Sequence, residues 1–106
     1  MKRKESIERI KKKINTNWNV AALTTAVDYE KYKVILEIKI DPNGNLTGPV
    51  KLVYPYKPEG RFIIAKRAAL KAVLDSTPFA MSKKMFPEGI TLKIKFDPAV
   101  TTGIAD

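Results

Sequence analysis

The side chains that could do chemistry in this 106-residue chain are carboxylates, lysines and tyrosines, because the sequence contains no cysteine and no histidine. That absence removes disulfides, thiol nucleophiles, imidazole bases and nearly all zinc chemistry. The acids occur singly where turns explain them, as with Asp41 and Asp97 before prolines and Glu88 between Pro and Gly. The sequence has no glycine-rich phosphate loop, paired-carboxylate spacing or nucleophile elbow. We therefore expect a protein that is not an enzyme, with no cofactor, metal or small-molecule substrate.

Basic residues are in excess, and they are unevenly distributed. The formal net charge is +9, from 20 Lys and Arg against 11 Asp and Glu. The first 13 residues hold seven of the basic residues and only two of the acids. Such a distribution favours acidic partners or anionic surfaces through long-range steering. A solvated helix face is the simpler explanation of the same charges.

Length and composition indicate one domain. A chain of 106 residues, 44% of them hydrophobic, can bury a single core but not two. We expect this domain to span residues 1–98 and residues 99–106 to form a disordered tail. No run approaches the ~20 apolar residues of a membrane span, and the start lacks the apolar segment of a signal peptide. Taken literally, the chain is soluble and cytoplasmic, but an excised domain with an added start codon would look the same.

A predicted β-hairpin from Lys33 to Tyr54 organises the fold. Its first strand, Lys33–Ile40, alternates with period two, so one face is dry and the other wet. The dry face is formed by Val34, Leu36, Ile38 and Ile40. The Asp41–Gly44 turn suits a tight reversal, with Asp41 capping it. The second strand, Leu46–Tyr54, contains Gly48-Pro49, so we expect an edge strand that is bulged there.

Two helices and a third strand are predicted around this hairpin. Isoleucines at spacings of three and four indicate an amphipathic helix from Glu5 to about Trp18, with Trp18 folded back onto the core. A second helix, Arg61–Asp75, is ended by Ser76-Thr77-Pro78, and the alternating segment Gly89–Phe96 is a third strand. The apolar arc assigned to the second helix comprises Phe62, Ile63, Ala65, Ala69, Leu70, Val73 and Leu74. Plugs over the core rim are expected from Phe79, Met81, Met85 and Phe86.

The connections predict the topology. The hairpin makes the first two strands antiparallel, and the second helix returns the chain so that the third strand runs parallel to the second. Pairing of the third strand with the first gives the order second, first, third, in which the proline-containing strand lies at an edge. The predicted fold class is therefore α+β, with a three-stranded antiparallel sheet in order 2-1-3 and both helices on one face.

The outer edge of the third strand is the predicted binding site, because its backbone groups lack a neighbour and can accept an extended peptide as a further strand. Lys93 and Lys95 either only discourage self-association or also attract acidic residues of a partner. A secondary contact is predicted at Tyr54 and Tyr56, which could instead pack against their own scaffold. The predicted partner-binding residues are Gly89, Ile90, Thr91, Leu92, Lys93, Ile94, Lys95 and Phe96.

Several motifs in this order resemble the C-terminal domain of TolA, within the TolA/TonB C-terminal domain superfamily. They are Ile-Asp-Pro-Asn-Gly-Asn-Leu-Thr-Gly-Pro at 40–49, Arg-Ala-Ala-Leu-Lys-Ala-Val at 67–73, Thr77-Pro78-Phe79 and the closing Lys-Phe-Asp-Pro at 95–98. The resemblance extends back through an isoleucine-rich helix ending in Trp18-Asn19, and so covers roughly residues 5–98. Signatures typical of TonB are absent.

The resemblance implies a periplasmic module of the Tol-Pal system, which maintains cell-envelope integrity and acts in cell division. Such a module is anchored in the inner membrane by a segment that precedes it. It implies a TolB-like partner that contributes an extended N-terminal segment, and use of the domain in colicin import and by filamentous phage coat proteins. Some members carry a cysteine pair, whereas this chain has Asn17 and Ser76 at the nearest positions. We therefore expect the first helix to be held by Trp18 and the isoleucines alone.

The rival interpretation is a small basic nucleic-acid-binding domain. Lys39, Lys93 and Lys95 on the wet sheet face, beside Tyr54 and Tyr56, would form its surface. A sheet that reads RNA usually presents stacking aromatics on its open face, and the first strand offers only Ile35, Glu37 and Lys39 there. A purely structural dimerisation module is a third possibility.

Overall fold

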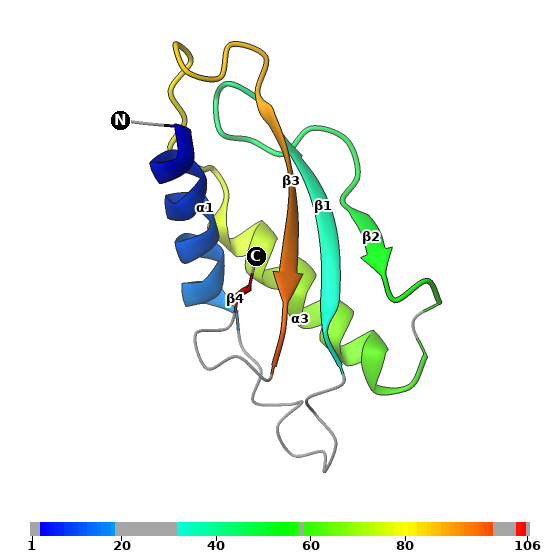
Figure 1. Ribbon diagram of the computed structural model, residues 1–106. Coiled ribbons are helices and arrows are strands. Elements are labelled where there is room, and N and C mark those ends of the chain that lie inside the picture. The colour runs from blue at the N-terminus through cyan, green and yellow to red at the C-terminus, as the bar shows by residue number, and fades with distance from the viewer. Residues whose placement is uncertain (1–2, 19–31, 58, 99–103, 106) are drawn as a thin grey trace.

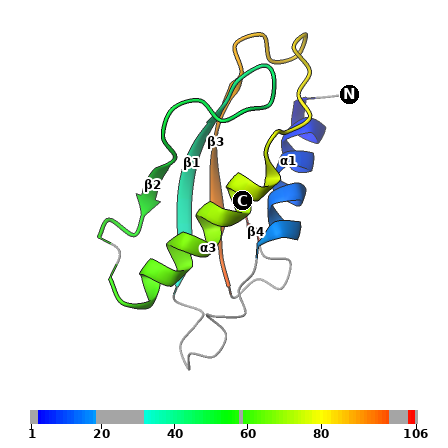
Figure 2. The ribbon, with the colours of Figure 1, turned by 180° about the vertical axis from the view of Figure 1, so that it is seen from behind.

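The computed structural model of the chain describes residues 3–18, 32–57, 59–98 and 104–105. Within these residues the secondary structure comprises α1 (Arg3–Asn17), β1 (Val34–Ile40), β2 (Lys51–Tyr54), α3 (Arg61–Ser76), β3 (Ile90–Phe96) and β4 (Ile104–Ala105). The strands form one layer, α3 crosses behind it in Figure 1 and in front of it in the reverse view of Figure 2, and α1 lies to the side next to β3. The predicted helices and strands are all present, with bounds that differ by a few residues.

The sheet has the order β2-β1-β3-β4. Because β1 pairs antiparallel with both β2 and β3, the predicted three-stranded antiparallel sheet in order 2-1-3 is confirmed, as is the α+β fold class. Beyond these three strands the described sheet contains a fourth, β4, which pairs antiparallel with the end of β3. The sequence predicted that residues 99–106 form a disordered tail. Ile104–Ala105 instead pair with the outer edge of β3, whose backbone groups are otherwise unpaired there. The other tail residues lie outside the described part of the chain.

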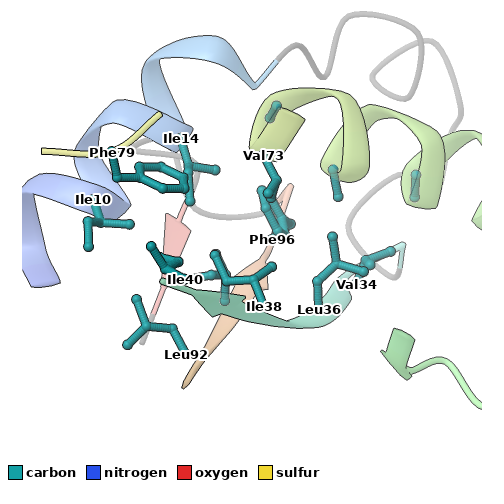
Figure 3. Close-up of a cluster of buried hydrophobic side chains, with 14 of the residues drawn as sticks. Ile10, Ile14, Val34, Leu36, Ile38, Ile40, Val73, Phe79, Leu92 and Phe96 are labelled. Atoms are coloured by element: carbon teal, nitrogen blue, oxygen red, sulfur yellow. The ribbon is translucent and has the colours of Figure 1, made fainter. Parts of the chain in front are cut away.

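The dry face of the sheet is built from cross-strand pairs between β1 and β3. Every inward residue of β1 stands opposite an apolar residue of β3, and all of them but Ile90 are at most 9% exposed. This register brings the two alternating patterns into phase, as the sequence predicts. The pairs are Val34 with Phe96, Leu36 with Ile94, Ile38 with Leu92, and Ile40 with Ile90. Figure 3 shows most of these side chains meeting residues of both helices.

Small side chains let α3 approach the sheet closely. Ala65, Ala69 and Ala72 are at most 3% exposed, and Val73 fills the space beside them. This alanine face, rather than the longer aliphatic residues, meets the sheet. Ile63 and Leu74, which the sequence assigned to the buried arc, are 40% and 51% exposed. That part of the prediction was wrong, because an apolar helix with alanines on one arc can bury only that arc.

The β1–β2 connection confirms the predicted cap and corrects the predicted bulge. The Asp41 carboxylate accepts hydrogen bonds from the backbone N–H groups of Asn43 and Asn45 at 2.8 and 3.0 Å. Leu46 makes only an isolated bridge to Ile40, and regular pairing starts at β2. The irregularity in the ladder lies opposite Ile35 and Leu36 rather than near Gly48-Pro49. The reason is that the chain leaves the sheet between Leu46 and Lys51, so the proline needs no bulge.

A cluster of polar bonds fastens the end of α1 to the end of α3. The Asn17 side-chain amide donates to Ser76 Oγ at 2.8 Å, and the fully buried Ser76 hydroxyl donates to the Ala72 carbonyl at 2.6 Å. Lys13 Nζ donates to the Pro78 carbonyl at 3.0 Å. The expectation that Trp18 and the isoleucines alone hold α1 was therefore wrong. Hydrogen bonds join the two helices at Asn17 and Ser76.

Aromatic residues close the two ends of the core. Phe79 and Phe86 are at most 3% exposed, which confirms their predicted role as plugs, and the Arg3 guanidinium lies 4.9 Å from the centre of the Phe86 ring. At the other end Trp18 packs edge-on against Phe96, with ring centroids 5.3 Å apart. Trp18 is only partly buried, although its indole N–H is buried and has no hydrogen-bond partner among the described residues. It therefore contributes ring packing rather than a polar anchor.

We expect Trp18→Ala to lower the free energy of unfolding by about 3 kcal/mol, the low end for deleting a large aromatic side chain, because the ring is only partly buried. Trp18→Phe should lose less than about 1.5 kcal/mol, since it keeps a ring against Phe96 and removes the unpaired N–H. Urea denaturation followed by circular dichroism measures both. Equal losses for the two variants would contradict ring packing as the role of Trp18.

The Asn17–Ser76 bond can be measured by a double-mutant cycle. Ser76→Ala and Asn17→Ala should each destabilise the protein by about 1 kcal/mol, the usual net value of a hydrogen bond. Because the two side chains contact each other, the double variant should lose less than the sum of the single variants. Additive losses would show that this bond does not couple the helices.

Candidate functional site

The outer edge of β3 is one place where the described strands leave backbone groups unpaired, and the outer side of the shorter strand β2 is another. One side of β3 pairs with β1 along its whole length, whereas the other side meets β4 only at Lys95 and Phe96. Within the described residues, the outer side from Ile90 to Ile94 has no strand partner. The predicted site, Gly89–Phe96, is therefore shortened at its end by β4. Figure 1 shows β4 beside the lower end of β3.

The direction of the β3 backbone groups follows from bonds on the far side of β1. Asp41 N donates to the Asn45 carbonyl and Thr47 N donates to the Lys39 carbonyl, both at 2.8 Å. Lys39 and Asp41 thus direct their backbone groups away from β3, and Ile40 between them faces it. Since this direction alternates along an antiparallel strand and Ile40 stands opposite Ile90, Thr91 and Lys93 point outward. These two residues supply the free donors and acceptors of the edge.

Lys95 shares the orientation of Thr91 and Lys93, but it stands opposite Ala105 of β4. In the ladder alternation this is a pair whose backbone groups face each other. The three residues that the sequence grouped together therefore differ. Two have open backbone groups, and the third faces β4.

Side chains of alternating charge cross the open face of the sheet beside this edge. Lys93 of β3 stands directly opposite Glu37 of β1, which in turn stands opposite Lys51 of β2. Thr91 stands opposite Lys39. Opposite charges in direct cross-strand positions contribute roughly 0.2–1 kcal/mol each. Glu37 thus offsets part of the basic charge at the centre, while Lys93 lies on the free edge, where an incoming strand would pass.

A turn with positive φ begins β3. Gly89 has φ of 80°, and its amide donates to the Phe86 carbonyl at 3.1 Å. A Cβ at this position would lie 2.1 Å from the Ile40 carbonyl oxygen. An open pocket of about 340 Å³ lies here, lined in part by Arg3, Glu88 and Thr91. The turn therefore places the start of β3 against the end of β1, and the pocket lies at this junction, where Lys39 and Thr47 also line it.

The two predicted contact tyrosines lie away from this edge. Tyr54 ends β2 on the opposite side of the sheet and packs edge-on against Phe62, which packs in turn against Tyr32. Tyr56 is 91% exposed. Tyr54 is 41% exposed and thus has a packing role as well as an open surface. The structure does not bring these tyrosines together with the β3 edge, because β1 and β2 separate them.

The sequence did not predict two features of the molecule, one at the β3 edge and one on α3. The pairing of Ile104–Ala105 with β3 rests on two residues, too few for a period-two pattern to be detected. Ile63, Ile64 and Leu74 project from α3 with exposed fractions of 37–51%. Their signal was present as apolar residues on more than one arc of the helix.

The part of the chain that the structure describes contains no helix long and apolar enough to span a membrane. Within those same residues, no three acidic side chains gather as metal ligands would. Comparison with protein-family models, with curated proteins and with solved structures finds no significant match to this chain.

Gly89→Ala should destabilise the protein more than Gly48→Ala. Both glycines have positive φ, 80° and 71° respectively, so both variants carry the cost of an L side chain in that region, about 1–3 kcal/mol. Only at Gly89 would the new Cβ meet another atom, since nothing lies within 4 Å of the Gly48 position. Thermal unfolding of the two variants isolates the clash. Equal melting temperatures would show that the start of β3 can shift away from β1.

Proposed function

We propose that the chain is a non-enzymatic protein–protein interaction module that binds an extended peptide by β-strand addition at the outer edge of β3. The observation that carries this proposal is the outward direction of the Thr91 and Lys93 backbone groups on a stretch, Ile90–Ile94, without a strand partner among the described residues. Main-chain hydrogen bonds then supply most of the affinity, as in other β-augmentation complexes.

The pairing of β4 supports the proposal, because it is itself an addition of an antiparallel segment to this edge. The same strand edge continues from the end paired with β4 toward the start of β3, along the unpaired residues Ile90–Ile94. A peptide of about five residues is enough to cover Ile90–Ile94 at one residue per position. A longer peptide has to displace β4 or pass beyond the start of β3.

Side chains along the edge favour particular residues in the peptide. On the open face, Lys93 is exposed beside the path of the added strand, so an acidic residue there gains a charge pair worth at most about 1 kcal/mol. On the dry face Leu92 is 9% exposed and Ile90 is partly buried. Apolar residues in alternate positions of the peptide would extend that face. The preferred ligand therefore alternates between apolar and acidic residues.

The sequence motifs shared with the TolA C-terminal domain suggest where such a ligand comes from. On that basis we propose that the module belongs to a Tol-Pal type envelope system, is periplasmic and is held at the inner membrane by a preceding segment. Its partner would be a TolB-like protein that contributes an extended N-terminal segment, and colicins or filamentous phage coat proteins would use the same edge. The open edge is compatible with all three ligands.

Nucleic acid is the weaker alternative. The open sheet face carries Lys39, Lys51 and Lys93, but its central strand presents Ile35 and Glu37 rather than rings on which bases could stack. Filter binding of a single-stranded oligonucleotide at two salt concentrations tests this alternative. Micromolar affinity with a steep salt dependence would favour it over peptide binding.

The main test compares Lys93→Pro with Lys93→Ala. Both variants lose the lysine charge, but only the proline removes an outward N–H and adds a ring to the edge. The proline leaves the bonds to β1 in place, because those come from Ile90, Leu92 and Ile94. We expect Lys93→Pro to weaken binding of a synthetic peptide from the N-terminal segment of a TolB-like partner at least about tenfold, and Lys93→Ala up to about fivefold. Isothermal titration calorimetry measures both.

Thr91→Pro should behave like Lys93→Pro, whereas Lys95→Pro should have less effect on the peptide, because Lys95 faces β4. Circular dichroism must first show that each variant is folded. If folded Thr91→Pro and Lys93→Pro variants bind the peptide as tightly as the parent, the edge is not the site. If Lys93→Pro and Lys93→Ala weaken binding equally and Thr91→Pro does not weaken it, the interaction is electrostatic and not strand addition.

A further inference from the structure

An open groove lies on the helix layer, between the end of α1 and the outer side of α3. It has a volume of about 520 Å³ and is lined by Asn17, Ile64, Arg67, Ala68 and Lys71. The four α3 residues are spaced at three, four and seven positions from Ile64, so they share one face of the helix. We call this the α1–α3 groove. The sheet interaction leaves it unused, since the β3 edge belongs to the other layer (Figure 2).

Large apolar side chains that do not pack in the core are exposed in and beside this groove. Ile64 is 37% exposed in the groove, and Ile63 and Leu74 are 40% and 51% exposed on the same outer side of α3. These are three of the six large hydrophobic side chains that are exposed in the described chain. A single exposed apolar side chain needs no explanation, but three on the outer half of one helix indicate a contact surface, with Ile64 inside the groove and the other two beside it.

Basic side chains lie among these apolar residues on the outer side of α3. Among the described residues Arg67 forms no ion pair, and Lys71 pairs only with Asp75 of its own helix, at 2.6 Å, with both side chains largely exposed. Such a surface pair is readily exchanged for a partner carboxylate. The excess of positive charge also opposes a second copy of this chain, which would present the same basic residues at the contact. The complementary surface is therefore apolar and acidic.

The geometry also favours a helix as the occupant. α3 offers no unpaired strand edge, so recognition has to come from side chains. Ala68 lies between Ile64 and Lys71 on the groove face, and a small residue there lets another helix approach closely. An amphipathic helix presents apolar side chains at the three- and four-residue spacing that such a groove accepts. We propose that the α1–α3 groove docks an acidic amphipathic helix of a partner protein.

The probe for this proposal is a displayed library of helical peptides about 20 residues long, long enough to be helical in isolation, with varied apolar and charged positions. The library is selected on the parent protein and counter-selected on the Arg67→Glu/Lys71→Glu variant. We expect the enriched peptides to carry an apolar stripe flanked by Glu or Asp. A selected peptide should bind the double variant at least about tenfold more weakly than the parent in fluorescence anisotropy.

Two controls separate the groove from general attraction and from the β3 edge. Lys83→Glu/Lys84→Glu makes the same charge change at exposed positions of the loop before β3 and should leave the affinity nearly unchanged. Lys93→Pro should also leave it unchanged, whereas it weakens the strand-forming peptide. An equal loss of peptide affinity in both double variants would show that the net charge of the protein, and not the groove, determines binding. Enrichment of basic or non-helical peptides, or of none, would overturn the proposal.

Other occupants give distinct results. Sedimentation that shows a dimer dissociated by Arg67→Glu would assign the groove to a second copy of the chain. Binding to vesicles containing anionic lipids that depends on Arg67 and Ile64, without binding of any selected peptide, would assign it to a membrane surface. Either result would contradict a helical protein partner, and neither would bear on the β3 edge.

Discussion

The structure depends on one interaction, the packing of a continuous apolar face shared by β1 and β3 against the two helices. Each inward residue of β1 has an apolar partner on β3, and a slip of β3 by one residue would turn its apolar set to solvent. The face is covered by the alanine side of α3 and by Ile10 and Ile14 of α1, all nearly inaccessible to solvent. Positions, lengths and directions of the other elements follow from this requirement.

That constraint also determines which surfaces are left for binding. Because β1 must be central to bury its inward face fully, β2 and β3 lie on either side of it, and β3 is the longer and more regular of the two. Its backbone groups alternate between β1 and solvent, so burial of the strand and exposure of its edge are compatible. Lys93 on this edge both discourages pairing between copies of the chain and suits an acidic ligand.

Covering the sheet with alanines has a second consequence. An alanine face brings α3 close to the sheet but cannot hold the longer aliphatic residues of the same helix, which remain on the outer side. The bonds of Asn17, Ser76 and Lys13 then fasten α1 against α3 where a disulfide is not available. The groove between the helices arises at this junction, and Arg67 and Lys71 give it its charge.

The sequence by itself determined the two helices, the first three strands, their order and the dry face, because period-two and helical patterns are local and the turns between them are marked by glycine and proline. It also identified β3 as the candidate edge. Only the tertiary structure decided how much of that edge is free, since the pairing of Ile104–Ala105 depends on a neighbour distant in the sequence. It likewise decided which arc of α3 is buried and that Asn17 meets Ser76. Several arcs of α3 are apolar. The distance between helix and sheet determines which of them is buried, and a local sequence pattern does not contain that distance.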